Sequence, residues 1–153
     1  MKYALALIAC LLSSGCAMGP PTPDPTATIA IQKSGCGYIA ACPTYSMSMN
    51  PDGAFSYEGF RHIGAIGIRE GQLPAGAWER AEAAFAAAGW DTLENPTSRA
   101  GGIPCMSDSP VVRITRRVRD GEEKVFIYNL GCESERGQIL LTAIDAILTP
   151  PSQ

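Results

Sequence analysis

The side chains best suited to chemistry in this 153-residue chain are six cysteines and a single histidine. Five residues separate Cys36 from Cys42, which Pro43 follows, and 26 residues separate Cys105 from Cys132. Structural zinc sites typically use short Cys-x-x-Cys knuckles, and thioredoxin-like centres place a Cys-x-x-Cys pair at the start of a helix. Neither spacing occurs in this sequence, so the cysteine pattern favours disulfides over a metal or redox centre.

The first residues indicate a compartment in which disulfides form. Lys2 precedes an uncharged apolar run over residues 3–12, shorter than the about 20 residues that span a bilayer but suited to a signal peptide. Residues 12–16, Leu-Ser-Ser-Gly-Cys, resemble the bacterial lipobox, whose cysteine is acylated and becomes the mature N-terminus. We therefore predict a lipoprotein signal peptide over residues 1–15 and membrane attachment through an acylated Cys16.

The residues after Cys16 predict a tether. The segment over residues 16–28 contains four prolines, which favour extended polyproline geometry, and its 12 residues after Cys16 could reach roughly 37 Å from the membrane. A single folded domain should follow over residues 29–150. By analogy with the sorting rule of enteric bacteria, Ala17 favours the outer membrane, so we expect a lipid-anchored protein of the cell envelope that faces the periplasm. Ordinary secretory cleavage, with Cys16 incidental, is the alternative.

Four cysteines remain in the predicted domain: Cys36, Cys42, Cys105 and Cys132. An even number in an oxidising compartment predicts two disulfides, for which three pairings are possible. We favour Cys36–Cys42 with Cys105–Cys132. The net charge of −3 argues against a nucleic-acid partner.

No set of residues predicts catalysis. A hydrolytic triad would need His62 beside a nucleophile and a carboxylate, and the sequence has no Gly-x-Ser-x-Gly elbow. Asp108 lies in a long loop, where an Asp-Ser-Pro turn explains it without catalysis. Met47 and Met49 have a spacing that binds copper in some envelope proteins, but the same spacing is typical of a half-buried strand. We predict no catalytic residue, no metal and no cofactor.

Hydrophobic alternation and turn residues predict the first strands. Residues 27–34 indicate a strand, and residues 44–60 a hairpin around Asn50-Pro51-Asp52-Gly53. That turn pairs Met47 with Tyr57. It places Ser46, Ser48, Ser56 and Glu58 together on the opposite face. Residues 61–71 indicate a further strand, interrupted by glycines.

The second half predicts two helices and another hairpin. Residues 73–90 indicate a helix with Pro74 in its first turn and Gly89 at its end, and residues 91–110 a long loop. A hairpin around Asp120-Gly121 and a helix over residues 135–148, capped by Ser134, follow. The expected fold is a single small α+β domain, an antiparallel sheet of hairpins with two helices packed on it, stapled by disulfides.

The second hairpin also predicts a contact surface. A two-residue turn would pair Ile114 with Ile127 and leave one face basic. The residues of this predicted surface are Arg113, Arg117, Arg119, Lys124 and Tyr128. Such a face could meet anionic headgroups, lipopolysaccharide or an acidic partner, and the alternative is an ordinary solvated sheet face.

Several short motifs resemble one family over roughly residues 28–148. They are Cys42-Pro43-x-Tyr45 after Cys36, Asp52-Gly53, Tyr57-x-Gly59, Cys105 with Asp108 and Pro110, the strand over 111–115, and Gly131-Cys132. Together they are similar to the family called domain of unknown function 6438, whose first cysteine loop is tighter than the one here. The resemblance implies an envelope α+β domain and no particular reaction.

The functional prediction is therefore a non-enzymatic binding or structural domain with an envelope protein or glycan as partner. Two alternatives remain: a cell-envelope hydrolase or glycan-processing enzyme using His62 or Asp108, and an inhibitor of a lytic enzyme.

Overall fold

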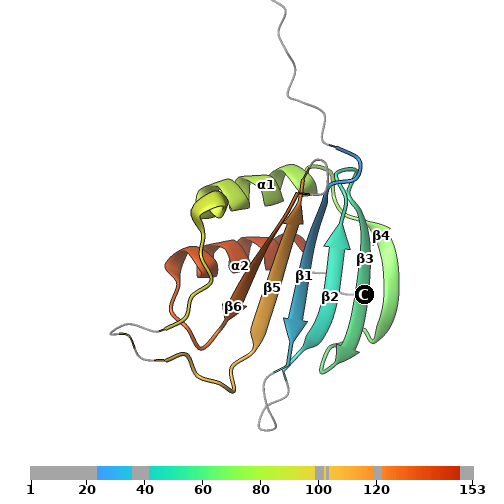
Figure 1. Cartoon of the computed structure of the whole chain (residues 1–153). Coiled ribbons are helices and arrows are strands. Elements are labelled where there is room, and N and C mark those ends of the chain that lie inside the picture. The colour runs from blue at the N-terminus through green and yellow to red at the C-terminus, as the bar shows by residue number, and fades with distance from the viewer. Residues whose placement is uncertain (1–23, 36–41, 99–101, 103, 119–121, 149–153) are drawn as a thin grey trace, which may run out of the picture.

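The computed structural model describes residues 24–35, 42–98, 102, 104–118 and 122–148 (Figure 1). The predicted signal peptide, Cys16, Cys36 and Arg119 lie outside the described residues. The elements are β1 Thr28–Ser34, β2 Thr44–Met49, β3 Ala54–Arg61, β4 Gly67–Gln72, α1 Ala77–Ala88, the 3-10 helix η1 Trp90–Thr92, β5 Val111–Arg117, β6 Glu123–Asn129 and α2 Glu135–Leu148.

The six strands form one sheet in the order β4-β3-β2-β1-β5-β6, with every neighbouring pair antiparallel. Both helices cover the same face of this sheet, and the opposite face is left open (Figure 1). Helix α2 crosses from β6, where Gly137 packs on Phe126, to β2, where the Tyr45 hydroxyl donates to Asp145 over 2.9 Å. The predicted α+β fold is confirmed.

The core lies between the helices and the covered face of the sheet. Strand residues Ile29, Ile31, Met47, Met49, Tyr57, Val112, Ile114 and Phe126 meet helix residues Trp78, Phe85, Leu140 and Ile144, all at most 5% exposed. Burial removes this apolar surface from water and supplies the main stabilising free energy. The Met-x-Met pair belongs to this core, as the half-buried strand interpretation expected.

The hairpin of β2 and β3 has the predicted register. Met47 lies opposite Tyr57, and the Asn50 amide donates to the Ala54 carbonyl over 3.0 Å. Gly53 has a φ of 85°, which a residue with a side chain adopts only with strain. Turn chemistry and hydrophobic pattern agree here, so the sequence determines which face each side chain takes.

Two predicted elements have different bounds in the structure. The strand predicted over residues 61–71 begins only at Gly67, because residues 62–66 form the turn from β3 and His62 adopts a left-handed φ of 53°. The helix predicted from residue 73 begins at Ala77, because Gly76 has a φ of 77° that interrupts helical geometry before that point. Pro74 therefore lies outside α1.

The predicted register of the second hairpin is wrong by one residue. Ile114 lies opposite Phe126 rather than Ile127, and the Val118 amide donates to the Glu122 carbonyl. Three residues, 119–121, therefore separate the paired positions where the prediction placed two. Because side chains alternate between faces, this shift moves every residue of β6 to the face opposite the predicted one.

Candidate functional binding surface

The open face of the sheet contains a hollow with a volume of about 350 Å³. Two rows of directly opposed residues line it. The first row is Arg113, Gln32, Ser46, Glu58 and Ile68, and the second contains Thr115, Ala30, Ser48 and Ser56. Apart from Gln32, the side chains in the middle of the two rows are small: Ala30, Ser46, Ser48 and Ser56. The sheet is therefore hollowed between the longer side chains that flank them. A volume of this size is in the range of small-ligand sites.

The polar groups of this hollow have no partner among the described residues. No hydrogen bond or ion pair within that part of the chain involves the side chains of Gln32, Ser46, Ser48, Ser56, Glu58, Arg113 or Thr115. Their donors and acceptors are therefore available to a ligand or to water. Elsewhere in the described chain, each buried side-chain nitrogen and oxygen has a hydrogen-bond partner.

The two charges of the hollow lie on opposite sides of it. Arg113 projects from β5 and Glu58 from β3, and β1 and β2 separate these strands. Gln32 and Ser46 lie between them in the same row. Ile68 lies directly opposite Glu58 and is 71% exposed, so an apolar wall adjoins the carboxylate. The hollow can accept a cation at one end and an anion at the other.

The predicted basic surface is divided between the two faces of the sheet. Arg113 and Arg117 face the open side, and Arg117 pairs with Glu123 at 2.7 Å. Lys124 lies on the covered side, where its Nζ donates to the carbonyls of Trp90 and Asp91. Tyr128 is 3% exposed and packs in the core. The prediction of one shared surface is wrong, because it depended on the shifted register.

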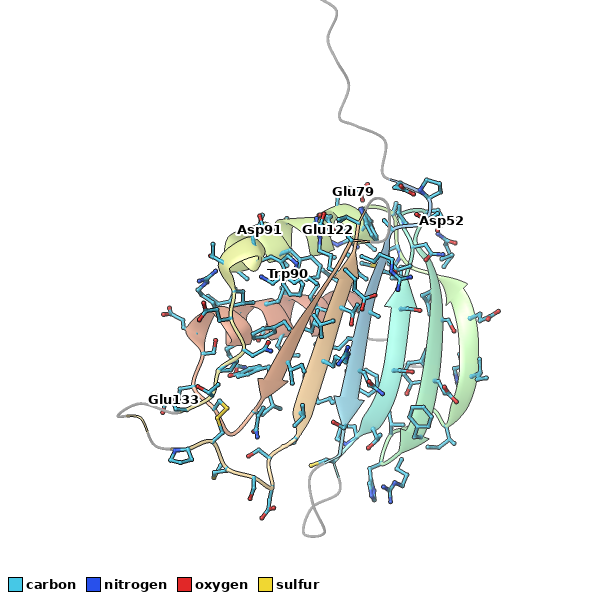
Figure 2. All side chains as sticks on the ribbon, viewed as in Figure 1. Asp52, Glu79, Trp90, Asp91, Glu122 and Glu133 are labelled. Carbon is cyan, nitrogen blue, oxygen red and sulfur yellow. A yellow bond between two sulfur atoms is a disulfide. The ribbon has the colours of Figure 1, made fainter. Side chains whose placement is uncertain are left out.

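Arg116 lies on the covered face of the sheet with Ile114 and has a defined partner. Its Nε and Nη2 atoms donate to the two carboxylate oxygens of Glu82 over 2.9 and 2.6 Å, and its guanidinium lies over the Phe85 ring. Trp90 packs edge-on against Phe126, between the helices and β6 (Figure 2). A second hollow adjoins these residues, but its Arg116 and Glu82 charges are bound to each other.

The disulfide between Cys105 and Cys132 is present, with Cα atoms 4.7 Å apart. It ties the long loop to the end of β6, where Asn129 also donates to the Met106 carbonyl. Cys42 is disulfide-bonded. The predicted pairing with Cys36 falls outside the described residues.

The two residues of the enzymatic alternative are both exposed and lie on different loops. His62 is in the turn after β3, and Asp108 is in the loop before β5. Asp108 accepts a long hydrogen bond of 3.4 Å from the neighbouring Ser107 hydroxyl. Neither residue lines the open-face hollow.

Two further features bear on ligands and membranes. Across the described residues, no three histidine, cysteine, aspartate or glutamate side chains converge as a metal site would require. Neither α1 nor α2, the helices of the described chain, is both long and apolar enough to cross a bilayer.

The family model described as Domain of unknown function (DUF6438) matches residues 27–148, which run from the start of β1 to the end of α2. The chain belongs to this family. The matched region includes the whole open face of the DUF6438 domain and its Cys105–Cys132 disulfide. No curated protein matches the chain.

Sequence reasoning identified part of the hollow and missed the rest. The alternation of the first hairpin already placed Ser46, Ser48, Ser56 and Glu58 on one face. Gln32 and Arg113 were not connected with them, because only the strand order places β1 between β2 and β5. The strand order, not a local motif, completes the site.

Proposed function

We propose that this chain is a non-enzymatic binding domain of a bacterial envelope lipoprotein, attached to a membrane through acylated Cys16 and facing the periplasm. The leader pattern supports the anchor, and a disulfide-stapled domain suits an oxidising compartment. The ligand binds on the open face of the sheet.

The observation that carries the binding function is the hollow of unpaired polar groups. Antiparallel sheets often leave one polar face solvated, and side chains of opposite charge on such a face can pair across strands. Here the central positions are Ala30, Ser46, Ser48 and Ser56, and the charges flanking them are unpaired within the described chain. A ligand of matching polarity would replace the water of these groups with direct hydrogen bonds.

The binding function is tested by filling the hollow. The full chain is immobilised, and fractionated envelope peptides and glycans are passed over it. Ser48→Trp places a large side chain in the middle of the hollow and should abolish retention of the bound fraction. Ala83→Trp on the exposed side of α1 is the matched control and should retain it. Equal retention by both variants would remove the open face as the binding site.

The anchor is tested separately by mass spectrometry of the N-terminal peptide. The expected mature N-terminus is Cys16 carrying acyl chains, and Cys16→Ser should release the protein from the membrane fraction. An unmodified N-terminus beyond residue 16 would contradict the lipoprotein assignment and leave the binding function intact.

A further inference from the structure

We propose that the open-face hollow binds a short peptide with both ends free, its carboxylate on Arg113 and its ammonium group on Glu58. This inference rests on the proposed binding function and specifies its ligand. It follows from the two unpaired charges of opposite sign, which lie in one row with neutral hydrogen-bonding groups between them.

The spacing of the strands sets the length of the ligand. Three inter-strand steps separate β5 from β3, which corresponds to about 14 Å between the Cα atoms of Arg113 and Glu58. An extended chain covers at most about 3.3–3.6 Å per residue, and the two long side chains can lean toward the ligand. A peptide of about three to four residues therefore spans the row.

The groups between the charges match the backbone of such a peptide. Gln32 offers an amide that both donates and accepts, and Ser46 offers a hydroxyl that does the same. Ser48, Ser56 and Thr115 add hydroxyls along the second row. The hydroxyls and the amide can rotate to suit peptide N–H or C=O groups. They therefore bind the backbone of the ligand and do not select the side chains between its two ends.

The end near β4 selects an apolar first residue. Ile68 lies directly opposite Glu58, and Phe60 lies two residues further along β3, where the pairing of β3 with β2 shifts register. Both are exposed, at 71% and 44% respectively. A branched side chain at the ligand's N-terminal residue would cover this apolar surface while its ammonium group contacts the Glu58 carboxylate.

The charge pattern favours a peptide over a neutral glycan. A neutral sugar would use the hydroxyl rows but would leave Arg113 and Glu58 without ionic partners. A peptide with free ends supplies one charge of each sign, and hydrogen bonds to charged groups are stronger than neutral ones. Arg113 can hold a carboxylate with two parallel N–H donors.

The experiment measures binding of four tripeptides to the full chain in detergent by calorimetry and by ligand-observed NMR. The probes are Leu-Ala-Ala with free ends, its N-acetyl form, its C-terminal amide, and the doubly capped form. The free tripeptide should bind, and each cap should weaken binding by about tenfold or more. A length series from two to six residues should show the tightest binding at three or four.

Two charge-neutral variants identify which end meets which residue. Arg113→Gln should weaken binding of the free peptide but not of the C-terminal amide, because the amide has no carboxylate to lose. Glu58→Gln should weaken binding of the free peptide but not of the N-acetyl form. Arg117→Gln, on the same face but outside the hollow and paired with Glu123, is the matched control and should change nothing.

The possible failures are distinguishable. Equal binding of free and capped peptides, or tighter binding of a neutral disaccharide, would overturn the proposed ligand class while leaving the hollow as a binding site. If the control variant Arg117→Gln also lost binding to every probe, recognition by Arg113 and Glu58 in the hollow would be contradicted. If no tripeptide binds and Ser48→Trp also leaves retention of envelope ligands unchanged, both the ligand class and the binding function are wrong.

Discussion

Arg116 donates two hydrogen bonds to Glu82, which join strand β5 to helix α1. Arg116 is 21% exposed and Glu82 is 30% exposed, so water screens this pair less than a surface ion pair. A neighbouring pair, Arg117 and Glu123, is more exposed and lies on the open face. The two pairs provide a matched comparison.

Glu82→Ala should lower the free energy of unfolding by about 1.5–2 kcal/mol, because the half-buried guanidinium of Arg116 loses both carboxylate hydrogen bonds. Glu123→Ala should cost at most about 0.5 kcal/mol, since exposed ion pairs contribute little. Urea denaturation of each variant measures the difference. If both substitutions lowered the free energy of unfolding equally, the lower exposure of the Arg116–Glu82 pair would make no difference to its contribution.

Alkaline pH should destabilise the protein through two buried tyrosines and the partly buried Tyr45. Burial, reinforced by the charge of Asp145 and the hydrogen bond to it, raises the pKa of Tyr45 above its ordinary value, and burial also raises the pKa values of Tyr57 and Tyr128. Above about pH 10 the unfolded chain loses these protons while the folded chain keeps them, so stability falls as pH rises. Below that pH their contribution is constant.

Tyr45→Phe should reduce the steepness of this alkaline loss, because one of the three titrating groups is removed. The measurement is the free energy of unfolding in urea between pH 8 and pH 10.5, for the wild-type chain and for Tyr45→Phe. The variant should also be less stable at pH 8 by about 1 kcal/mol, since Asp145 loses a hydrogen bond. A pH slope identical to that of the wild type would contradict the assignment.

Gly59→Ala should destabilise the turn between β3 and β4. A Cβ atom at position 59 would overlap the carbonyl oxygen of Ala65 and lie 2.8 Å from the Tyr57 hydroxyl, which itself donates to that carbonyl. Forcing these atoms apart should cost about 2–3 kcal/mol. Gly64→Ala is the control, because nothing lies within 4 Å of its Cβ position, and its effect should be within about 0.5 kcal/mol.

Replacing Cys105 and Cys132 by serine should cost about 3–4 kcal/mol, since the disulfide closes a loop with a sequence separation of 27. The loop from η1 to β5 should then be cleaved faster by protease, because Cys105 ties it to the end of β6. Mass spectrometry of the unreduced wild-type digest should recover the linked peptides. An unchanged proteolysis rate would show that Asn129 and its neighbours hold the loop without the disulfide.

The local parts of this fold follow from the sequence, and particular residues show why. Asn50-Pro51-Asp52-Gly53 permits one turn, and Met47, Met49 and Tyr57 agree with the register that this turn sets. In β6, by contrast, Lys-Val-Phe-Ile-Tyr has apolar residues at both parities. Alternation therefore cannot decide which side chains of β6 face the core. The Asp-Gly dipeptide predicted a two-residue turn, one residue shorter than the turn in the structure.

Packing decides the face of β6. With Phe126 and Tyr128 inward, Trp90 can pack edge-on against Phe126, and Gly137 can bring α2 close to the same ring. Lys124 then lies inward as well, but its long stem carries Nζ to the carbonyls of Trp90 and Asp91 in η1. Lys124 can therefore lie on the covered face without burying its charge. The alternation of polar and apolar residues in the sequence does not reveal this.

The sequence by itself determined the α+β class, the first hairpin with its register and the helix α2 that Ser134 caps by accepting from the Gly137 amide. It left three cysteine pairings open and favoured Cys105–Cys132, the disulfide that the structure contains. Only the tertiary structure decided that β1 lies between β2 and β5, and therefore that Gln32 joins Ser46 and Glu58 on one side to Arg113 on the other. Turn chemistry and alternation act over a few neighbouring residues. Strand order depends instead on burying the largest side chains of the whole chain in one core, and so does the choice of which β6 side chains face that core.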